Sequence, residues 1–77
     1  MAKEITYQVK EKLGVLTTDE TQTVKKELRL VSWNGSSPVY EIRGWRYTED
    51  GEQALKGVTM TLDELKVLKT ILNESEV

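Results

Sequence analysis

The stretch VKKELRLVSWNGSSPVYEIRGWRY, residues 24–47, contains the clearest structural pattern in this 77-residue chain. Two runs of alternating side chains, residues 24–33 and 39–47, flank the segment NGSSP. Period-two alternation with β-branched and aromatic residues is typical of strands. A cluster of Asn, Gly, Ser and Pro between two such runs indicates a hairpin loop. The stretch therefore predicts two antiparallel strands joined by a short loop.

Weaker patterns on either side of this hairpin predict two further strands. Residues 4–17, EITYQVKEKLGVLT, begin with strict alternation, and Gly14 indicates either a bulge or a turn into a second short piece. Residues 55–60, LKGVTM, predict a short last strand after a polar loop over residues 48–53. The chain therefore predicts four strands that follow one another in sequence.

The last part of the chain predicts a helix that begins at a capping box. Thr61 is followed three residues later by Glu64, and Asp63 lies near the positive end of the helix dipole. An apolar stripe at helical spacing follows, made of Leu65, Leu68, Ile71 and Leu72. The acidic tail from about residue 74 is expected to fray. We predict a single α+β domain over residues 1–77, of order β-β-β-β-α, in which one helix covers one face of a four-stranded antiparallel sheet.

One helix leaves the other face of the sheet open, and alternation assigns side chains to the two faces. The helix-covered face is expected to take the apolar set, Leu28, Leu30, Tyr40 and Ile42. The open face is expected to take the aromatic and basic set, Lys25, Arg29, Trp33, Arg43, Trp45 and Tyr47. The same alternation adds Thr6, Gln8 and Lys10 to the open face. The two tryptophans therefore share a face with arginines rather than with leucines.

An open sheet face that carries indoles, a phenol and cations is a stacking platform for unpaired bases. Base–aromatic stacking contributes about 1–3 kcal/mol per base, and neighbouring cations follow the phosphates. Because the ring faces of a duplex are already occupied, such a surface favours single-stranded nucleic acid. The same rings are compatible with a protein interface, formed with a partner protein or with a second subunit, so this alternative stays open.

Composition limits the other classes of function. The chain has no His and no Cys, so we expect no enzyme, no metal and no cofactor. The net charge is −2, yet residues 24–47 hold five basic and two acidic residues, so a basic segment lies within an acidic chain. The sequence shows no apolar leader and no run of the roughly 20 apolar residues that a spanning helix needs. We therefore expect a cytoplasmic protein without membrane contact.

The segments KELRLVSWNGSSPVYEIRGW, residues 26–45, and LKGVTMTLDELKVL, residues 55–68, carry a family resemblance. Their order and spacing resemble the transcriptional positive cofactor four family, in particular its small bacterial single-stranded-DNA-binding members, over residues 4–73. The resemblance implies a homodimer in which the helices of two subunits pack together and two curved sheets form grooves for single-stranded nucleic acid. A dimer also suits a chain this short, which buries only about 60% of its surface on folding.

The resemblance also implies roles for individual residues. Phosphate contacts are expected from Lys25, Lys26, Arg29, Arg43 and Lys56, base stacking on Trp33 and Trp45, and a base or phosphate contact from Asn34. Gln8, Lys10 and Tyr47 join this set through their place on the open face. We predict a non-enzymatic homodimer that binds single-stranded DNA largely independently of sequence. RNA as a second ligand stays open, as does a role in transcription, replication, repair or DNA uptake, and a protein-interaction module is the alternative.

Overall fold

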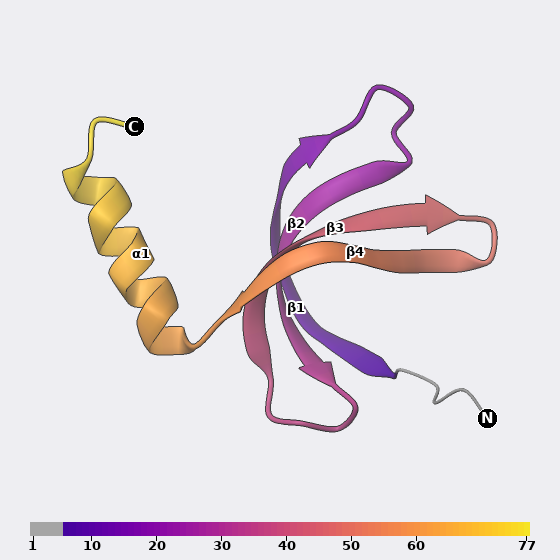
Figure 1. Cartoon of the computed structure of the whole chain (residues 1–77), viewed down its shortest axis with the longest axis horizontal. Coiled ribbons are helices and arrows are strands. Elements are labelled where there is room, and N and C mark those ends of the chain that lie inside the picture. Colours follow the sequence, from indigo (N-terminus) through magenta and orange to yellow (C-terminus); the bar gives the residue numbers. More distant parts are fainter. Residues whose placement is uncertain (1–5) are drawn as a thin grey trace.

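The computed structural model describes residues 6–77, which form a four-stranded antiparallel sheet followed by one helix (Figure 1). The elements are β1 (Tyr7–Thr18), β2 (Val24–Trp33), β3 (Val39–Thr48), β4 (Gly51–Met60) and α1 (Leu62–Glu74). The strand order in the sheet is β1-β2-β3-β4, so each strand pairs with its neighbour in sequence. This architecture confirms the predicted α+β fold of order β-β-β-β-α.

The two outer strands differ from the sequence pattern in their continuity or length. β1 runs without a break through Gly14, so the glycine marks a bulge rather than a turn, with a register shift between Lys12 and Gly14. β4 begins at Gly51 instead of residue 55, because the polar segment after Thr48 pairs with β3 and leaves only a two-residue turn. Gly51 has a φ of 121°, which favours glycine, and this lets a strand start where the composition indicates a loop.

The sheet curls strongly, and its strands fan out from a common crossing in Figure 1. β1 and β4 lie at opposite edges of the sheet, yet the Tyr7 hydroxyl donates to Glu52 Oε2 at 2.8 Å. Bulges in β1 and between β3 and β4 increase the local twist. Gly57 permits a close approach of strands, since a Cβ there would lie 2.7 Å from Arg43 Cβ and 2.8 Å from the Ile42 carbonyl oxygen.

The most deeply buried side chains lie on the concave side of this curl. They are Glu27, Arg29, Val31, Glu41 and Trp45, each at most 1% exposed. We name this side the aromatic face, because it also carries Tyr7, Trp33 and Tyr47. The apolar set Leu28, Leu30, Tyr40 and Ile42 lies on the opposite side, as predicted, but its members are only half-buried. The curl closes the aromatic face, whereas the helix leaves the other face partly uncovered.

Helix α1 begins at the predicted capping box. Thr61 Oγ1 accepts from the Glu64 backbone N–H at 3.1 Å, and Glu64 Oε1 accepts from the Thr61 backbone N–H at 2.8 Å. The helix stands apart from the sheet in Figure 1 and buries none of its side chains. Within residues 6–77, no helix is long and apolar enough to cross a membrane.

An apolar cleft of about 520 Å³ separates the helix from the sheet. Its apolar lining comes from Leu13, Leu16, Leu28, Ile42, Leu65, Leu68 and Leu72. Leu72 and Ile71 are about half exposed, at 49% and 55%. Three of the four residues of the predicted apolar stripe, Leu65, Leu68 and Leu72, therefore face a cleft that this chain does not fill.

Candidate nucleic-acid interface

Both tryptophans lie on the aromatic face, opposite the cleft beside α1. The pairing of β2 with β3 has no register shift, so alternation holds along both strands, and Lys25 lies opposite Trp45. Leu28 and Ile42 pair with each other and point to the helix side, where they line the cleft. The sequence-based assignment of the two faces of β2 and β3 is therefore correct.

Trp45 is fully buried, which overturns the prediction that its ring is open to a base. The Arg29 guanidinium carbon lies 4.0 Å from the Trp45 ring centroid, and the Trp33 ring stacks at 6.2 Å with an interplanar angle of 7°. The Tyr7 ring lies 5.4 Å away. Within residues 6–77 the Trp45 Nε1 has no hydrogen-bond partner. The curl of the sheet brings β1 over this indole, so the ring is part of the core.

Arg29 is also buried, at 1% exposure, so its predicted place on an open surface is wrong. Its Nε donates to Glu27 Oε1 at 2.7 Å, and its Nη1 and Nη2 donate to the two oxygens of Glu52 at 2.8 and 3.1 Å. Burial opposes the charged form, but the hydrogen bonds that Arg29 donates to Glu52 and Glu27 raise the pKa of Arg29 on balance. Because an isolated buried cation is very costly, the negative charges of these two carboxylates offset the cost of burying Arg29.

Tyr47 completes the cluster around Arg29. Its hydroxyl accepts from Arg29 Nη2 at 3.0 Å and donates to Glu27 Oε2. Burial raises the pKa of Tyr47, and its bond to Glu27 raises it further. The pKa of Glu27 is lowered on balance, since hydrogen bonds from Tyr47 and Arg29 outweigh the effect of burial. The predicted site residue Tyr47 therefore has a structural role in this cluster.

Trp33 and Arg43 remain partly open at the edge of the aromatic face. Glu41 is fully buried and binds both: Trp33 Nε1 donates to Oε1 at 2.6 Å, and Arg43 Nε donates to Oε2 at 2.6 Å. The Arg43 guanidinium carbon lies 5.0 Å from the Trp33 ring centroid. This pair keeps the predicted combination of an accessible indole with a neighbouring cation.

The residues that β1 contributes to the aromatic face differ from the predicted ones. Tyr7 pairs with Trp33 and Lys12 with Arg29, whereas Gln8 pairs with Ser32 and so lies on the helix side. Gln8 is therefore wrongly assigned to the aromatic face. Lys10 lies at a register shift, and its Nζ donates to Gln8 Oε1 at 2.8 Å.

Tyr7 and Lys12 are two residues of the aromatic face that the pattern misses. Lys12 Nζ lies 3.3 Å from Glu27 Oε1 and 5.9 Å from the Tyr47 ring centroid, while its side chain stays 48% exposed. Alternation divides the side chains of a strand into two sets. It does not show which of these sets lies on the same side of the sheet as a given set of the neighbouring strand. Only the pairing register does that, and β1 contains three register shifts.

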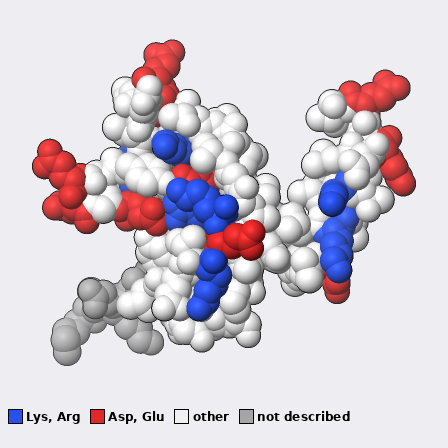
Figure 2. All heavy atoms as spheres, turned by 180° about the vertical axis from the view of Figure 1, so that it is seen from behind, with Lys and Arg blue, Asp and Glu red and all other residues white. Residues whose placement is uncertain are grey.

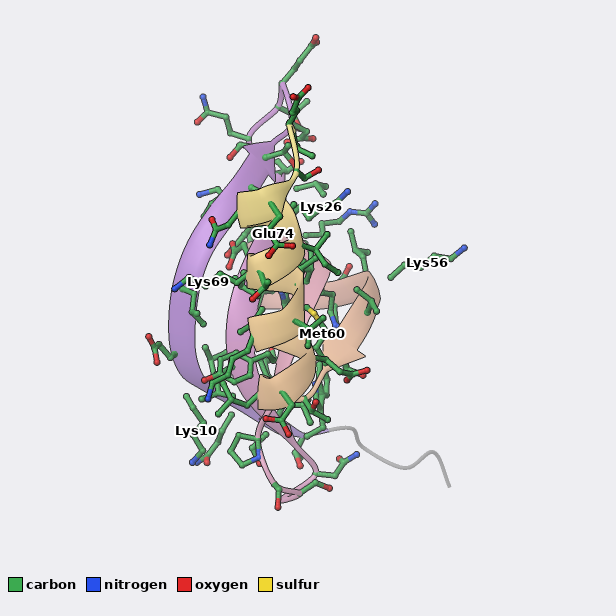
Figure 3. All side chains as sticks on the ribbon, turned by 90° about the vertical axis from the view of Figure 1, so that its left-hand side faces the viewer. Lys10, Lys26, Lys56, Met60, Lys69 and Glu74 are labelled. Atoms are coloured by element: carbon green, nitrogen blue, oxygen red, sulfur yellow. The ribbon has the colours of Figure 1, made fainter. Side chains whose placement is uncertain are left out.

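The remaining predicted cations lie on both sides of the sheet. Lys25 belongs to the aromatic face, with its Nζ 5.4 Å from the Tyr47 ring centroid. Lys26 and Lys56 are exposed and line a shallow hollow together with Ile42, Arg43, Gly57 and Val58. Figure 3 shows Lys56 pointing away from the sheet. Lys26 therefore shares no face with Lys25, as alternation requires.

Charge is distributed unevenly over the surface. Figure 2 shows Lys and Arg atoms gathered over the middle of the sheet, with acidic atoms at the tips of the β1–β2 and β3–β4 hairpins. Asn34, at the β2–β3 hairpin, uses its Oδ1 to accept from the Thr6 backbone N–H at 3.0 Å. Its φ of 50° suits this turn position. This bond gives Asn34 a structural task in tying β1 to the hairpin.

Two comparisons with known proteins match most of the residues that form this surface. The sequence profile of a family described as Transcriptional Coactivator p15 (PC4) matches residues 21–71, which include β2, β3, β4 and most of α1. An uncharacterized protein of Treponema pallidum (strain Nichols) is 37% identical over 67 residues, covering 87% of this chain and 75% of the relative. The matched family is the one that the sequence motifs resemble. The chain therefore belongs to the Transcriptional Coactivator p15 (PC4) family.

Proposed function

We propose that this protein binds single-stranded DNA, largely independently of sequence, as a non-enzymatic homodimer. Membership of the Transcriptional Coactivator p15 (PC4) family supports a nucleic-acid-binding role. The observation that carries the proposal is the Trp33 indole, which is partly exposed and held by Glu41 with the Arg43 guanidinium 5.0 Å from its ring centroid. A fixed ring beside a cation is the arrangement that stacks a base and contacts its phosphate.

The aromatic face offers the partly exposed Trp33 ring and several cations. The Tyr7 ring lies 5.1 Å from the Trp33 ring and extends the apolar surface for a base. Lys12 and Lys25, both near the Tyr47 ring, supply charges for the phosphates. Every base has a π-face, so stacking tolerates any sequence, and cation–phosphate contacts make binding weaken as salt rises.

The homodimer is proposed from the cleft beside α1. One wall of the cleft is lined by Leu65, Leu68 and Leu72, and the other by Leu28 and Ile42. The chain therefore leaves a continuous apolar surface uncovered. Burying one leucine side chain contributes about 1.5–3 kcal/mol, so covering several of them supplies a substantial driving force. The apolar stripe of a second copy has the composition needed to fill this cleft.

Tryptophan fluorescence of the intact protein tests the DNA-binding proposal. Titration with a single-stranded oligonucleotide should quench Trp33, whereas a duplex of equal length should quench much less because its ring faces are occupied. A parallel titration with RNA of the same sequence measures the preference between the two nucleic acids. Equal responses to single strand and duplex, or no response to either, would refute the proposal.

A further inference from the structure

Glu52 reaches across the aromatic face from β4 and is held by donors from two other strands. Its Oε2 accepts from Arg29 Nη1 at 2.8 Å and from the Tyr7 hydroxyl at 2.8 Å, and its Oε1 accepts from Arg29 Nη2 at 3.1 Å. Its side chain is 25% exposed, whereas that of Arg29 is 1% exposed. The carboxylate therefore covers the outer edge of the guanidinium from the solvent side.

The donors around Glu52 form a site for one oxyanion. The guanidinium presents two parallel N–H groups, a geometry that fits carboxylates and phosphates equally well. A hydroxyl from the first strand adds a third donor. A phosphodiester group has two non-bridging oxygens that can replace the two carboxylate oxygens of Glu52 without a change in charge.

Contacts other than those with Glu52 also hold Arg29 in its position. Its Nε stays bonded to Glu27 Oε1 at 2.7 Å, and its guanidinium stacks on the Trp45 ring at 4.0 Å. Glu52 comes directly after Gly51 at the end of the β3–β4 hairpin. Rotation of one side chain toward solvent therefore frees the two outer N–H groups while the rest of the cluster stays in place.

We propose that Arg29 and the Tyr7 hydroxyl form a binding site for one backbone phosphate of the single strand, and that Glu52 occupies this site in the free protein as an internal competitor. The inference rests on the proposed function, because it assigns a phosphate contact to a strand already bound at Trp33. It also gives Arg29, although buried in the free protein, a way to take part in binding.

Charge-neutral replacement of the competitor tests the site. Glu52→Gln and a control, Glu49→Gln, are titrated with a single-stranded thymidine oligonucleotide at several salt concentrations, beside the unmodified protein. Glu49 is exposed and belongs to the same hairpin, so the two changes alter the net charge equally. We expect Glu52→Gln to bind about tenfold tighter than the control, with a log–log salt slope steeper by about 0.7, the value for one more phosphate contact on a single strand.

The outcomes separate this inference from the proposed function. Binding by all three proteins with equal affinity and equal salt slope refutes the phosphate site alone. An absence of binding by all three refutes the proposed function and the phosphate site with it. Circular dichroism establishes that each variant is folded at the assay temperature.

A second variant keeps the inference testable if Glu52→Gln is unstable. Tyr7→Phe removes one donor of the site and leaves its ring in place. We expect it to weaken binding several-fold, while Tyr40→Phe, on β3 opposite Met60 and on the helix side of the sheet, leaves affinity unchanged. Equal effects of the two changes would contradict a role for the Tyr7 hydroxyl.

Discussion

The Trp33 indole N–H donates to Glu41 Oε1 at 2.6 Å, and this bond fixes a partly exposed ring of the aromatic face. The other oxygen of the same carboxylate accepts from Arg43 Nε at 2.6 Å. Glu41 is itself fully buried. One carboxylate therefore sets the positions of both the proposed stacking ring and its neighbouring cation.

Glu41→Ala should destabilise the fold by about 1–3 kcal/mol, because it leaves the Arg43 Nε and the Trp33 N–H, both partly buried, without their acceptor. Urea unfolding measures this difference. The control, Glu49→Ala, removes an exposed carboxylate and should change the free energy of unfolding by no more than about 0.5 kcal/mol. A loss at Glu41 no larger than at Glu49 would contradict the anchoring role.

The two tryptophans should respond differently to substitution. Trp33→Leu should weaken single-strand binding by about 1–3 kcal/mol and leave the protein folded, since this ring is partly exposed. Trp45→Ala should lower the free energy of unfolding by about 3–5 kcal/mol, because this ring is fully buried. Fluorescence titration and urea unfolding of both variants distinguish these roles. Loss of affinity without loss of stability at Trp45 would show that its ring meets the DNA directly.

Stability should fall at both ends of the pH range. Hydrogen bonds from Arg29 lower the pKa of Glu52, and the pKa of Glu27 is lowered as well, so their contribution is present above the unfolded value of 4.5 and is lost as pH falls below it. Burial and the bond to Glu52 raise the pKa of Tyr7 to about 12. Its contribution is therefore present below pH 10.0, the unfolded value, and is lost between about 10 and 12.

Urea unfolding over a series of pH values measures both limits. Tyr7→Phe should remove part of the alkaline loss and leave the acid loss in place, because phenylalanine does not titrate. Tyr40→Phe serves as the control on the helix side of the sheet. An unchanged alkaline limit in Tyr7→Phe would show that another group sets it.

Leu68→Asp should convert the proposed dimer to a monomer, since it places a charge in the apolar cleft beside α1. Analytical ultracentrifugation of the two proteins at equal concentration measures the change. Thr70→Asp is the matched control, because Thr70 is an exposed helix residue outside the lining of the cleft. Equal oligomeric states for the two variants would place the subunit interface elsewhere.

Gly57→Ala should destabilise the sheet by about 1–3 kcal/mol, because the new methyl group would meet Arg43 Cβ at 2.7 Å and a backbone oxygen at 2.8 Å. Gly14→Ala is the control, since a Cβ there meets no atom within 4 Å. It should be neutral or stabilising by up to about 1 kcal/mol. Thermal unfolding of the two variants compares them directly.

Sequence patterns predict the central hairpin well because its pairing is regular. β2 spans the predicted residues 24–33, and the β2–β3 pairing contains no register shift, so alternation alone places Trp33 opposite Leu28 with respect to the sheet. The capping box likewise predicts the start of α1. These features depend on residues close together in sequence.

Features that depend on distant residues are not predictable in this way. The phase of β1 follows from three register shifts, which the alternation of Tyr7 and Gln8 does not reveal. The burial of Trp45 follows from the curl that joins Tyr7 to Glu52, 45 residues apart. The sequence pattern shows aromatic and basic residues on one face, but not that carboxylates from three strands already pair with the arginines.

The strand order β1-β2-β3-β4 has a consequence for the way the chain folds. Every strand finds its partner across a short loop, so little chain entropy is lost before each pairing contributes. We expect each hairpin to form rapidly, starting from its turn, on a timescale of about milliseconds or less. We expect the two edge strands, β1 and β4, to approach each other late in folding. Formation of the Tyr7–Glu52 contact is then a separate folding step.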